Sequence, residues 1–320
     1  MNKLKKLLRN NPITHRLYQK LKNKKEAKLV AARYKGKYSF ENRSKGYSKA
    51  CIVLIGYKPF LYDAFFSRFC RFLEPNIDVL LVSSGLYSEQ VSEIAKKKGF
   101  SYLSTKRNNV CLALNIGIHL FEQALFFYKI DEDIFLTKGF FSQLSFTYDQ
   151  LSKEGIISPG FVASLIPING YCYAKVLEKT NTTDDYQKQF GKIIFGAGHD
   201  KPIESDPKVA KFFWGEGDHF PKIDKINEKL SKDPFAYSMS PVRFSIGAIY
   251  FSKDFIKRIK YLSISKSSND FGMDEQQLCE ACVNLSCPMV ISENSLVGHL
   301  GFGPQNSIMK QYFLDHPERF

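Results

Sequence analysis

Residues 125–133 read Leu-Phe-Phe-Tyr-Lys-Ile-Asp-Glu-Asp, an apolar run that ends in three consecutive acids. A short apolar, aromatic run of this kind predicts a buried strand. Side chains alternate along a strand, so Asp131 and Asp133 are expected on the same side of the chain. Two carboxylates at the carboxyl end of a central strand lie where parallel α/β sheets bind their ligands.

Strands and helices are predicted to alternate around this run. Strands are predicted over residues 50–57, 77–83, 102–103, 125–130, 244–251 and 288–291. Helices are predicted over residues 61–73, 88–98, 110–124, 253–259 and 274–284, with Ser88 as a cap residue. The alternation predicts an α/β fold with a parallel sheet wrapped by helices. Residues 156–240, in contrast, are predicted to be mainly loops.

The positive charge of the chain is concentrated at its N-terminus. The net charge is +14, but residues 1–37 hold 13 Lys or Arg and one Glu, while residues 38–320 hold 33 basic and 31 acidic residues. A nearly neutral folded part argues against a nucleic-acid-binding domain. In the arm, leucines at positions 4, 7, 8, 17 and 21 are spaced to align on one side of two short helices broken near Pro12. Such a cationic amphipathic arm is expected on an anionic membrane surface, and a solvated basic tail is the alternative.

Several features bear on the compartment. No apolar run approaches the roughly 20 residues needed to cross a bilayer, and no signal-peptide apolar region follows the first lysines. The seven cysteines are an odd, scattered set, which argues for a reducing compartment. Cys279, Cys282 and Cys287 lack the second close pair that a structural zinc site uses. We therefore expect a cytoplasmic protein, peripheral on the inner membrane face.

The paired acids also indicate a metal. Two ionised carboxylates held side by side repel each other unless a cation lies between them. Mg²⁺ and Mn²⁺ are commonly held by one or two carboxylates together with the phosphates of a substrate. Asp131 and Asp133 therefore predict a divalent metal site for a phosphate-bearing ligand.

Residues 109–118 (Asn-Val-Cys-Leu-Ala-Leu-Asn-Ile-Gly-Ile) and 128–135 (Tyr-Lys-Ile-Asp-Glu-Asp-Ile-Phe) resemble the GT-A glycosyltransferases. Family 2-like members show a similar Ala-x-Asn-x-Gly-Ile ahead of an acidic Asp-x-Asp motif. The resemblance covers residues 50–140, and the rest only in outline. It implies a domain over residues 38–320 with a Rossmann-like mixed, mostly parallel sheet flanked by helices, in which residues 50–140 bind the nucleotide and residues 141–320 the acceptor.

The same resemblance implies an activity. It implies metal-dependent transfer of a sugar from a nucleotide diphosphate to a glycan or lipid-linked glycan, with UDP as the favoured nucleotide and a galactose-type hexose as the starting assumption. Asp133 would bind the metal directly, and Asp131 would contact the ribose or, through water, the metal. The other donor-side candidates are Ser83, Ser84, Lys106, Arg107 and Asn115. For the last three, a solvated loop or a backbone-satisfied polar group is the alternative.

Two further constellations lie near the C-terminus. Asp274 and Glu275 begin a predicted helix, where acids complement the helix dipole. The resemblance also implies a general base at this position, for which Asp274 is preferred to Glu275. If neither faces the acceptor, a retaining mechanism is the alternative. His299, between Gly298 and Gly301, is the third candidate metal ligand, because several GT-A families complete the metal shell with a C-terminal His. A satisfied polar residue with no ligand role is the alternative.

The acceptor side has one main candidate segment. Trp214, the only tryptophan, can stack on a sugar while Glu216 or Asp218 accepts hydrogen bonds from hydroxyl groups, and a packed turn with a buried indole is the alternative. A sugar-nucleotide pyrophosphorylase is a further alternative, but it needs a glycine-rich loop after the first strand. Residues 56–60, which follow that strand, read Gly-Tyr-Lys-Pro-Phe and lack this loop, which argues against a pyrophosphorylase. A non-catalytic nucleotide- or glycan-binding module at the membrane stays open. By analogy, a cytoplasmic enzyme with a cationic arm suits assembly of a lipid-linked bacterial polysaccharide such as lipopolysaccharide O-antigen or capsule.

Overall fold

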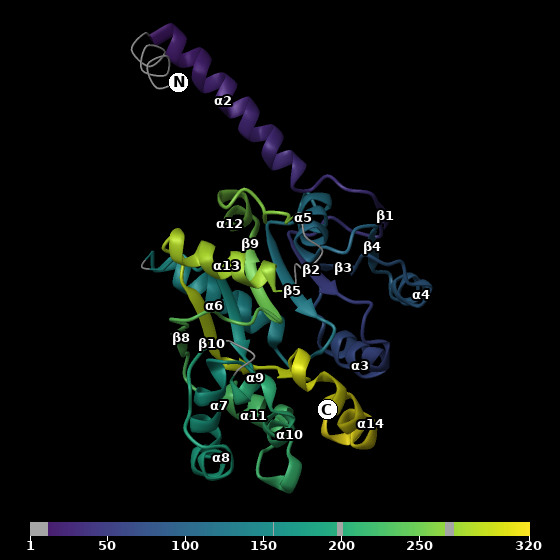
Figure 1. Cartoon of the computed structure of the whole chain (residues 1–320), viewed down its shortest axis with the longest axis vertical. Coiled ribbons are helices and arrows are strands. Elements are labelled where there is room, and N and C mark those ends of the chain that lie inside the picture. Colours follow the sequence, from purple (N-terminus) through teal and green to yellow (C-terminus); the bar gives the residue numbers. More distant parts are fainter. Residues whose placement is uncertain (1–11, 156, 197–200, 266–271) are drawn as a thin grey trace.

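A nine-stranded sheet with the strand order β1-β4-β3-β2-β5-β9-β7-β10-β8 forms the centre of the molecule (Figure 1). The computed structural model describes residues 12–155, 157–196, 201–265 and 272–320. The strands are β1 Tyr38–Glu41, β2 Lys49–Leu54, β3 Ile77–Ser84, β4 Ser101–Thr105, β5 Phe126–Asp131, β7 Phe161–Leu165, β8 Tyr237–Met239, β9 Ala248–Ser252 and β10 Met289–Leu296. A separate two-stranded ribbon pairs β6 Ile134–Phe135 with β11 Gly298–His299.

The sheet is mixed, with most strands running in one direction. β4, β3, β2 and β5 are parallel neighbours, and β7 is parallel to β10. β9 runs antiparallel between β5 and β7, while β1 and β8 are antiparallel edge strands. This confirms the predicted α/β fold with a mostly parallel sheet.

Helices cover the sheet and its ends. The helices of the globular part are α3 Tyr62–Phe72, α4 Glu89–Lys98, α5 Val110–Leu120, α6 Phe140–Lys153, α7 Cys172–Thr180, α8 Thr183–Phe190, α9 Pro202–Ser205, α10 Pro207–Phe213, α11 Ile223–Leu230, α12 Lys253–Arg258, α13 Met273–Asn284 and α14 Asn306–Asp315. Short 3₁₀ turns are η1 Pro59–Leu61, η2 Glu216–Asp218, η3 Gly303–Gln305 and η4 Pro317–Arg319. The predicted cap of α4 is confirmed, because Ser88 Oγ accepts a hydrogen bond from the backbone N–H of Val91 at 3.3 Å.

The prediction of loops over residues 156–240 is wrong. That segment contains β7 and the helices α7, α8, α10 and α11. The helices are short and are separated by the residues that usually mark turns. Asn181 caps the end of α7 at a φ of 57°, and Pro207 begins α10. Asn and Pro are also common in loops, so the composition of this segment does not distinguish helix ends from loops. Two other predicted elements are shorter than expected, since α5 ends at Leu120 and β9 begins only at Ala248.

The hydrophobic core lies on both faces of the sheet. Ala50 to Val53 of β2 are fully buried, as expected for a central parallel strand. Many of the aromatic residues pack here, and the rings of Tyr128 and Tyr250 lie 4.5 Å apart across β5 and β9. The aromatic content of the chain therefore serves largely to fill the core.

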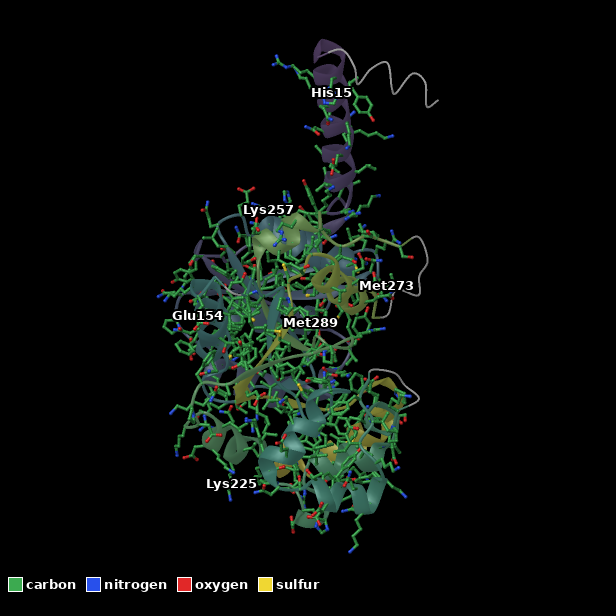
Figure 2. All side chains as sticks on the ribbon, turned by 90° about the vertical axis from the view of Figure 1, so that its left-hand side faces the viewer. His15, Glu154, Lys225, Lys257, Met273 and Met289 are labelled. Atoms are coloured by element: carbon green, nitrogen blue, oxygen red, sulfur yellow. The ribbon has the colours of Figure 1, made fainter. Side chains whose placement is uncertain are left out.

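Helix α2 (Pro12–Ala32) projects away from the globular part (Figures 1 and 2), and His15 marks its far end. The described arm is one helix from Pro12, while the first predicted arm helix lies outside the described residues. At its root, the Arg33 guanidinium donates hydrogen bonds to the carbonyls of Ile259, Lys260 and Tyr261 at 3.3, 2.9 and 2.5 Å. Within the described part of the chain, no helix combines the length and apolar character needed to cross a membrane.

Candidate active site

The acidic motif lies at the carboxyl end of β5, beside the end of β2. The two strands are parallel, with Leu54 opposite Asp131. The carboxylate of Glu132 accepts hydrogen bonds from the backbone N–H groups of Gly56 at 2.9 Å and Tyr57 at 3.0 Å. Burial raises the pKa of Glu132, although these N–H groups oppose the shift. Glu132 therefore anchors the loop after β2 instead of facing a ligand.

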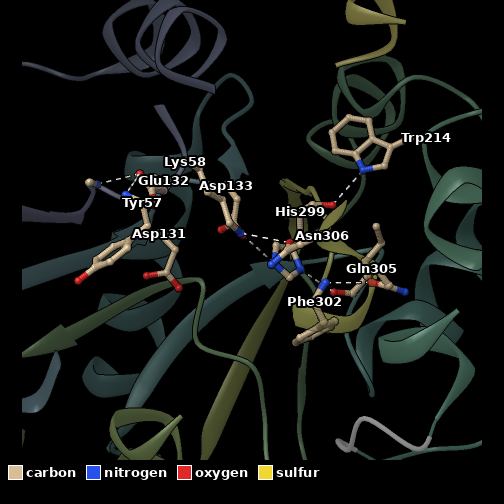
Figure 3. Close-up of polar contacts among 12 residues, drawn as sticks. Tyr57, Lys58, Asp131, Glu132, Asp133, Trp214, His299, Phe302, Gln305 and Asn306 are labelled. Atoms are coloured by element: carbon tan, nitrogen blue, oxygen red, sulfur yellow. Dashed lines mark hydrogen bonds and ion pairs between the residues drawn. The ribbon is translucent and has the colours of Figure 1, made fainter. Parts of the chain in front are cut away.

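Asp133 is buried between a lysine and a histidine (Figure 3). Its carboxylate forms an ion pair with Lys58, and its Oδ2 lies 3.6 Å from His299 Nε2. Burial alone would raise the pKa of Asp133, but Lys58 and His299 outweigh it and hold this pKa well below its usual range. Asp133 is consequently an ionised carboxylate in the folded protein.

The β6–β11 ribbon brings His299 to this position. His299 pairs with Ile134, and the backbone N–H of Leu300 donates to the carbonyl of Asp133 at 3.0 Å. His299 Nδ1 lies 3.1 Å from the carbonyl oxygen of Ile168. A carbonyl oxygen only accepts, so Nδ1 donates in this contact, and Nε2 is the ring nitrogen that faces Asp133.

Asp131 belongs to a second cluster, built around a buried lysine. Lys129 Nζ lies 2.7 Å from Asp131 Oδ2 and 3.8 Å from Asp274 Oδ2, and it donates to the carbonyl of Ile246 at 3.1 Å. Only 3% of the Lys129 side chain is exposed, compared with 32% of Asp131. Burial raises the pKa of Asp131 to about 6, although Lys129 opposes the shift. Lys129 thus connects the end of β5 to the first turn of α13.

Glu275, the other acid at the start of α13, has a different partner. Its Oε1 lies 2.5 Å from Arg243 Nε. Burial raises the pKa of Glu275, although Arg243 opposes this shift. The two predicted base candidates therefore differ, because Glu275 holds an arginine closely while Asp274 faces the shared lysine.

The loop after β2 completes the surroundings of the acids. Lys58 Nζ also lies 3.3 Å from Asn306 Oδ1, at the first residue of α14. The Tyr57 hydroxyl donates to the carbonyl of Ser84, and the side chain of Tyr57 is exposed beside Asp131 in Figure 3. Lys58, Lys129, Tyr57 and Asn306 were not predicted as site residues.

The three predicted metal ligands do not form one cluster. Among the residues that the structure describes, no group of three or more His, Cys, Asp and Glu side chains is arranged to hold a metal ion. Asp133 and His299 approach each other, whereas Asp131 is paired with Lys129. One carboxylate oxygen nevertheless suits Mn²⁺ or Mg²⁺ when phosphates and water supply the other ligands, and of these two ions Mn²⁺ is the one that accepts an imidazole nitrogen more readily. The residues therefore fit a metal held only in part by the protein.

No protein-family model and no curated protein matches the chain. Among solved structures, it is similar to a mannosyltransferase from Pyrobaculum calidifontis in complex with GDP-Man and Mn²⁺, with 10% identity, a TM-score of 0.45, and coverage of 84% of this chain and 62% of that one. It is also similar to S. aureus TarS, with 9% identity, a TM-score of 0.44, and coverage of 83% and 64%. A mycobacterial protein has 11% identity, a TM-score of 0.41, and coverage of 92% and 78%.

This chain thus spans less than two thirds of the mannosyltransferase and TarS structures that it resembles. Similarity at this level carries no information about individual side chains. The chemistry has to be inferred from the residues at the end of β5.

The predicted donor-side serines serve internal contacts. Ser83 Oγ donates to the carbonyl of Ile55 at 2.9 Å, and Ser84 Oγ accepts from the backbone N–H of Asn109 at 2.8 Å. Both serines are buried. Their hydroxyl groups join β3 to its neighbours, so direct hydroxyl contacts to a nucleoside are not supported.

The other donor-side candidates lie around α5. Asn115 is fully buried, and its amide is satisfied by backbone groups of Arg33 and Leu262. This is the backbone-satisfied alternative, and it excludes a direct ligand contact by Asn115. Lys106 and Arg107 are exposed after β4, and the Arg107 guanidinium donates to the carbonyl of Ser265.

The structure corrects the predicted sugar-stacking role of Trp214. Trp214 is only 4% exposed, and its ring stacks on that of Phe320 with the ring centroids 4.1 Å apart. Trp214 Nε1 donates to the carbonyl of His299 at 3.0 Å. The indole therefore supports the backbone of His299 and has no free face for a sugar. Glu216 and Asp218 are exposed and pair with Lys211 at 3.4 Å and Arg319 at 3.5 Å.

Proposed function

We propose that this protein is a metal-dependent glycosyltransferase that transfers a sugar from a nucleotide diphosphate to a glycan or lipid-linked glycan. The observation that carries the proposal is the bridge from Asp131 through Lys129 to Asp274. Sugar transfer needs charge compensation at the departing diphosphate and a base for the attacking hydroxyl. Through this lysine, the end of β5, which would face the donor, is joined to the acid that we propose as the base.

The donor side of the proposal rests on Asp133 and His299. These residues would hold Mn²⁺ or Mg²⁺ with the donor phosphates, and Asp131, with a third of its side chain exposed, would contact the ribose or a metal-bound water. When bound, a divalent cation neutralises the charge that develops on the diphosphate. The exposed Tyr57 ring is a candidate contact for the nucleoside in place of the buried serines. A UDP-hexose, with galactose-type sugars first, is the donor to test.

The acceptor side rests on Asp274. In an inverting reaction, its carboxylate would take the proton of the acceptor hydroxyl while that oxygen bonds to the anomeric carbon and the bond to the diphosphate breaks. Asp274 is preferred to Glu275 because Glu275 is held at 2.5 Å by Arg243, whereas Asp274 lies 3.8 Å from Lys129. The more loosely paired carboxylate has fewer contacts to break before it can reach an acceptor hydroxyl.

Helix α2 is proposed to bind an anionic membrane, where a lipid-linked acceptor of a surface polysaccharide is available. It extends away from the globular part, is rich in lysine, and exposes Leu21 and Leu29. Basic residues attract anionic lipids, and exposed leucines can enter the headgroup region.

Nucleotide release from UDP-, GDP-, CMP- and dTDP-sugars, with and without Mn²⁺, tests the proposal. We expect Mn²⁺-dependent release from one donor, abolished in Asp133→Ala and retained in Glu228→Gln, a control at an exposed acid on α11. Release without metal, or full activity of Asp133→Ala, would contradict the assigned roles. Absence of both release and metal-dependent nucleotide binding would contradict the function itself.

A further inference from the structure

Lys58 is held in a defined position at the centre of the donor side. It precedes η1, and its loop is fixed from both directions, because Glu132 accepts from the N–H groups of Gly56 and Tyr57 and the Tyr57 hydroxyl donates to Ser84. From this loop the ammonium group of Lys58 forms its ion pair with Asp133 (Figure 3). The lysine is therefore directed at the carboxylate that the proposed function assigns to the metal.

The ammonium group meets an electrostatic need of the ligand-free protein. Asp133 is a buried carboxylate, and a buried charge without a partner is strongly unfavourable. A divalent cation at Asp133 would supply the same compensation, and two cations at one carboxylate would repel each other. Lys58 and a metal therefore compete for Asp133. Both can be bound at the site only if another anion pairs with the Lys58 ammonium group.

Lys58 has the freedom to make such an exchange, and Lys129 does not. The Lys58 side chain is 20% exposed, whereas that of Lys129 is 3% exposed and is held by Asp131, Asp274 and a backbone carbonyl. A lysine carries its charge on a flexible four-carbon stem with three rotatable donors. The diphosphate of a donor is an anion of the right kind to receive it.

We propose that Lys58 is an exchanging cation, which pairs with Asp133 in the free protein and moves to the donor diphosphate when metal and donor bind together. This inference rests on the proposed function. Its consequence is coupled binding, because the metal displaces Lys58 readily only when the diphosphate is present to accept the ammonium group. Metal alone should therefore bind weakly.

Binding of Mn²⁺ to the free protein, measured by the loss of its electron paramagnetic resonance signal with and without UDP or GDP, tests this inference. In the wild type we expect the nucleotide to tighten Mn²⁺ binding by about tenfold or more, within the usual range of coupling between sites. In Lys58→Met, Mn²⁺ alone should bind more tightly, the nucleotide should bind more weakly, and most of the coupling should disappear. Lys310→Met is the matched control, because Lys310 lies over the ring of Phe60 in the same region and forms no ion pair with an acid among the residues that the structure describes.

Each outcome is informative. Unchanged Mn²⁺ affinity and coupling in Lys58→Met overturn the inference while leaving the transferase proposal intact. Tight nucleotide binding without Mn²⁺, lost in Lys58→Met, also overturns it, because Lys58 would then take the place of the metal. A wild type that binds neither Mn²⁺ nor nucleotide contradicts the proposed function and the inference together. If Lys58→Met does not fold, Lys58→Gln removes the same charge and keeps a hydrogen-bond donor.

Discussion

Lys129 lies between two acids of the candidate site, because its Nζ is 2.7 Å from Asp131 Oδ2 and 3.8 Å from Asp274 Oδ2. The two acids are 143 positions apart in the sequence and share one buried cation. Asp131 ends the central strand β5, and Asp274 lies in the first turn of α13. A change at Lys129 must therefore affect both the donor side and the acceptor side of the site.

Lys129→Met should destabilise the fold, since it leaves the buried carboxylate of Asp274 and the partly exposed one of Asp131 without their cation. Removing one partner of a buried ion pair costs about 3–5 kcal/mol in the free energy of unfolding. Urea unfolding followed by circular dichroism measures the loss. Lys253→Met is the control, because the ammonium group of the buried Lys253 donates to the carbonyls of Phe121 and Glu122 and, within the described part of the chain, pairs with no carboxylate. An equal or larger loss in the control would refute the role of Lys129 as a shared counterion.

Asp274→Asn should abolish most turnover while leaving donor binding intact. Loss of a general base typically lowers the rate by about 10²–10⁴-fold. Glu275→Gln should have a smaller effect, since that acid is committed to Arg243. Steady-state rates with donor affinities from calorimetry separate the two acids. The reverse ranking would transfer the proposed role to Glu275.

Trp214→Phe should weaken the metal site without changing acceptor recognition. The substitution removes the hydrogen bond from the indole to the buried carbonyl of His299. An unsatisfied buried acceptor costs about 1–3 kcal/mol of stability, and the backbone that carries His299 loses a support. The measurements are thermal unfolding, Mn²⁺ affinity and the acceptor KM. A raised acceptor KM with unchanged Mn²⁺ affinity would restore the original interpretation of Trp214 as a sugar platform.

Glu293 should contribute to loss of stability in acid. Burial alone would raise the pKa of Glu293, but Lys175 and Lys179, each 3.0 Å away, lower it overall. A lowered folded-state pKa means that the stabilisation is present above the unfolded-state pKa of about 4.3 and is lost as the pH falls through the folded-state value. Glu293→Gln should therefore be less stable than the wild type at neutral pH, and this difference should shrink below about pH 4. A pH-independent difference in urea unfolding would contradict this account.

Deletion of residues 1–29 should abolish binding to vesicles that contain anionic lipid and leave nucleotide release unchanged. This cut retains Arg33 and its contacts with the carbonyls of residues 259–261. Co-sedimentation at low and high salt measures binding, which should fall as salt screens the lysines. Equal binding of the full chain to neutral vesicles would argue against the electrostatic part of the proposal.

The first half of the fold can be predicted from sequence because its buried strands are continuous apolar runs. Strands β2, β3 and β5 and helices α3 and α4 all lie close to their predicted ranges. The helices between residues 172 and 230 are harder to predict, since they are short and end at residues such as Asn181. Their stability depends on packing against distant parts of the chain, which local sequence patterns do not contain.

The site is predictable in part for a related reason. The apolar run of residues 125–130 predicts that Asp131 and Asp133 lie at the end of a strand, and the structure confirms this position. His299 approaches Asp133, but their shared role as metal ligands stays a prediction. Lys58 and Lys129 are harder to predict, because tertiary structure brings Asp133 to the first and Asp274 to the second. A signal for Lys129 did exist, since a lysine inside an apolar buried strand requires a partner for its charge.

The root of helix α2 has a consequence for how the protein would meet a surface. The Asn115 amide binds the Arg33 carbonyl at 2.8 Å, and the ring of Tyr34 stacks on His119 with centroids 4.0 Å apart. The 21-residue helix, about 32 Å long at 1.5 Å per residue, is thus joined to the body by a bracket of contacts made by the two residues that follow it. For a helix that binds the membrane as proposed, a flexible tether would let the protein sample acceptors at any height above the bilayer. A bracket would fix one height, so an acceptor would be selected by its length before its chemistry is recognised.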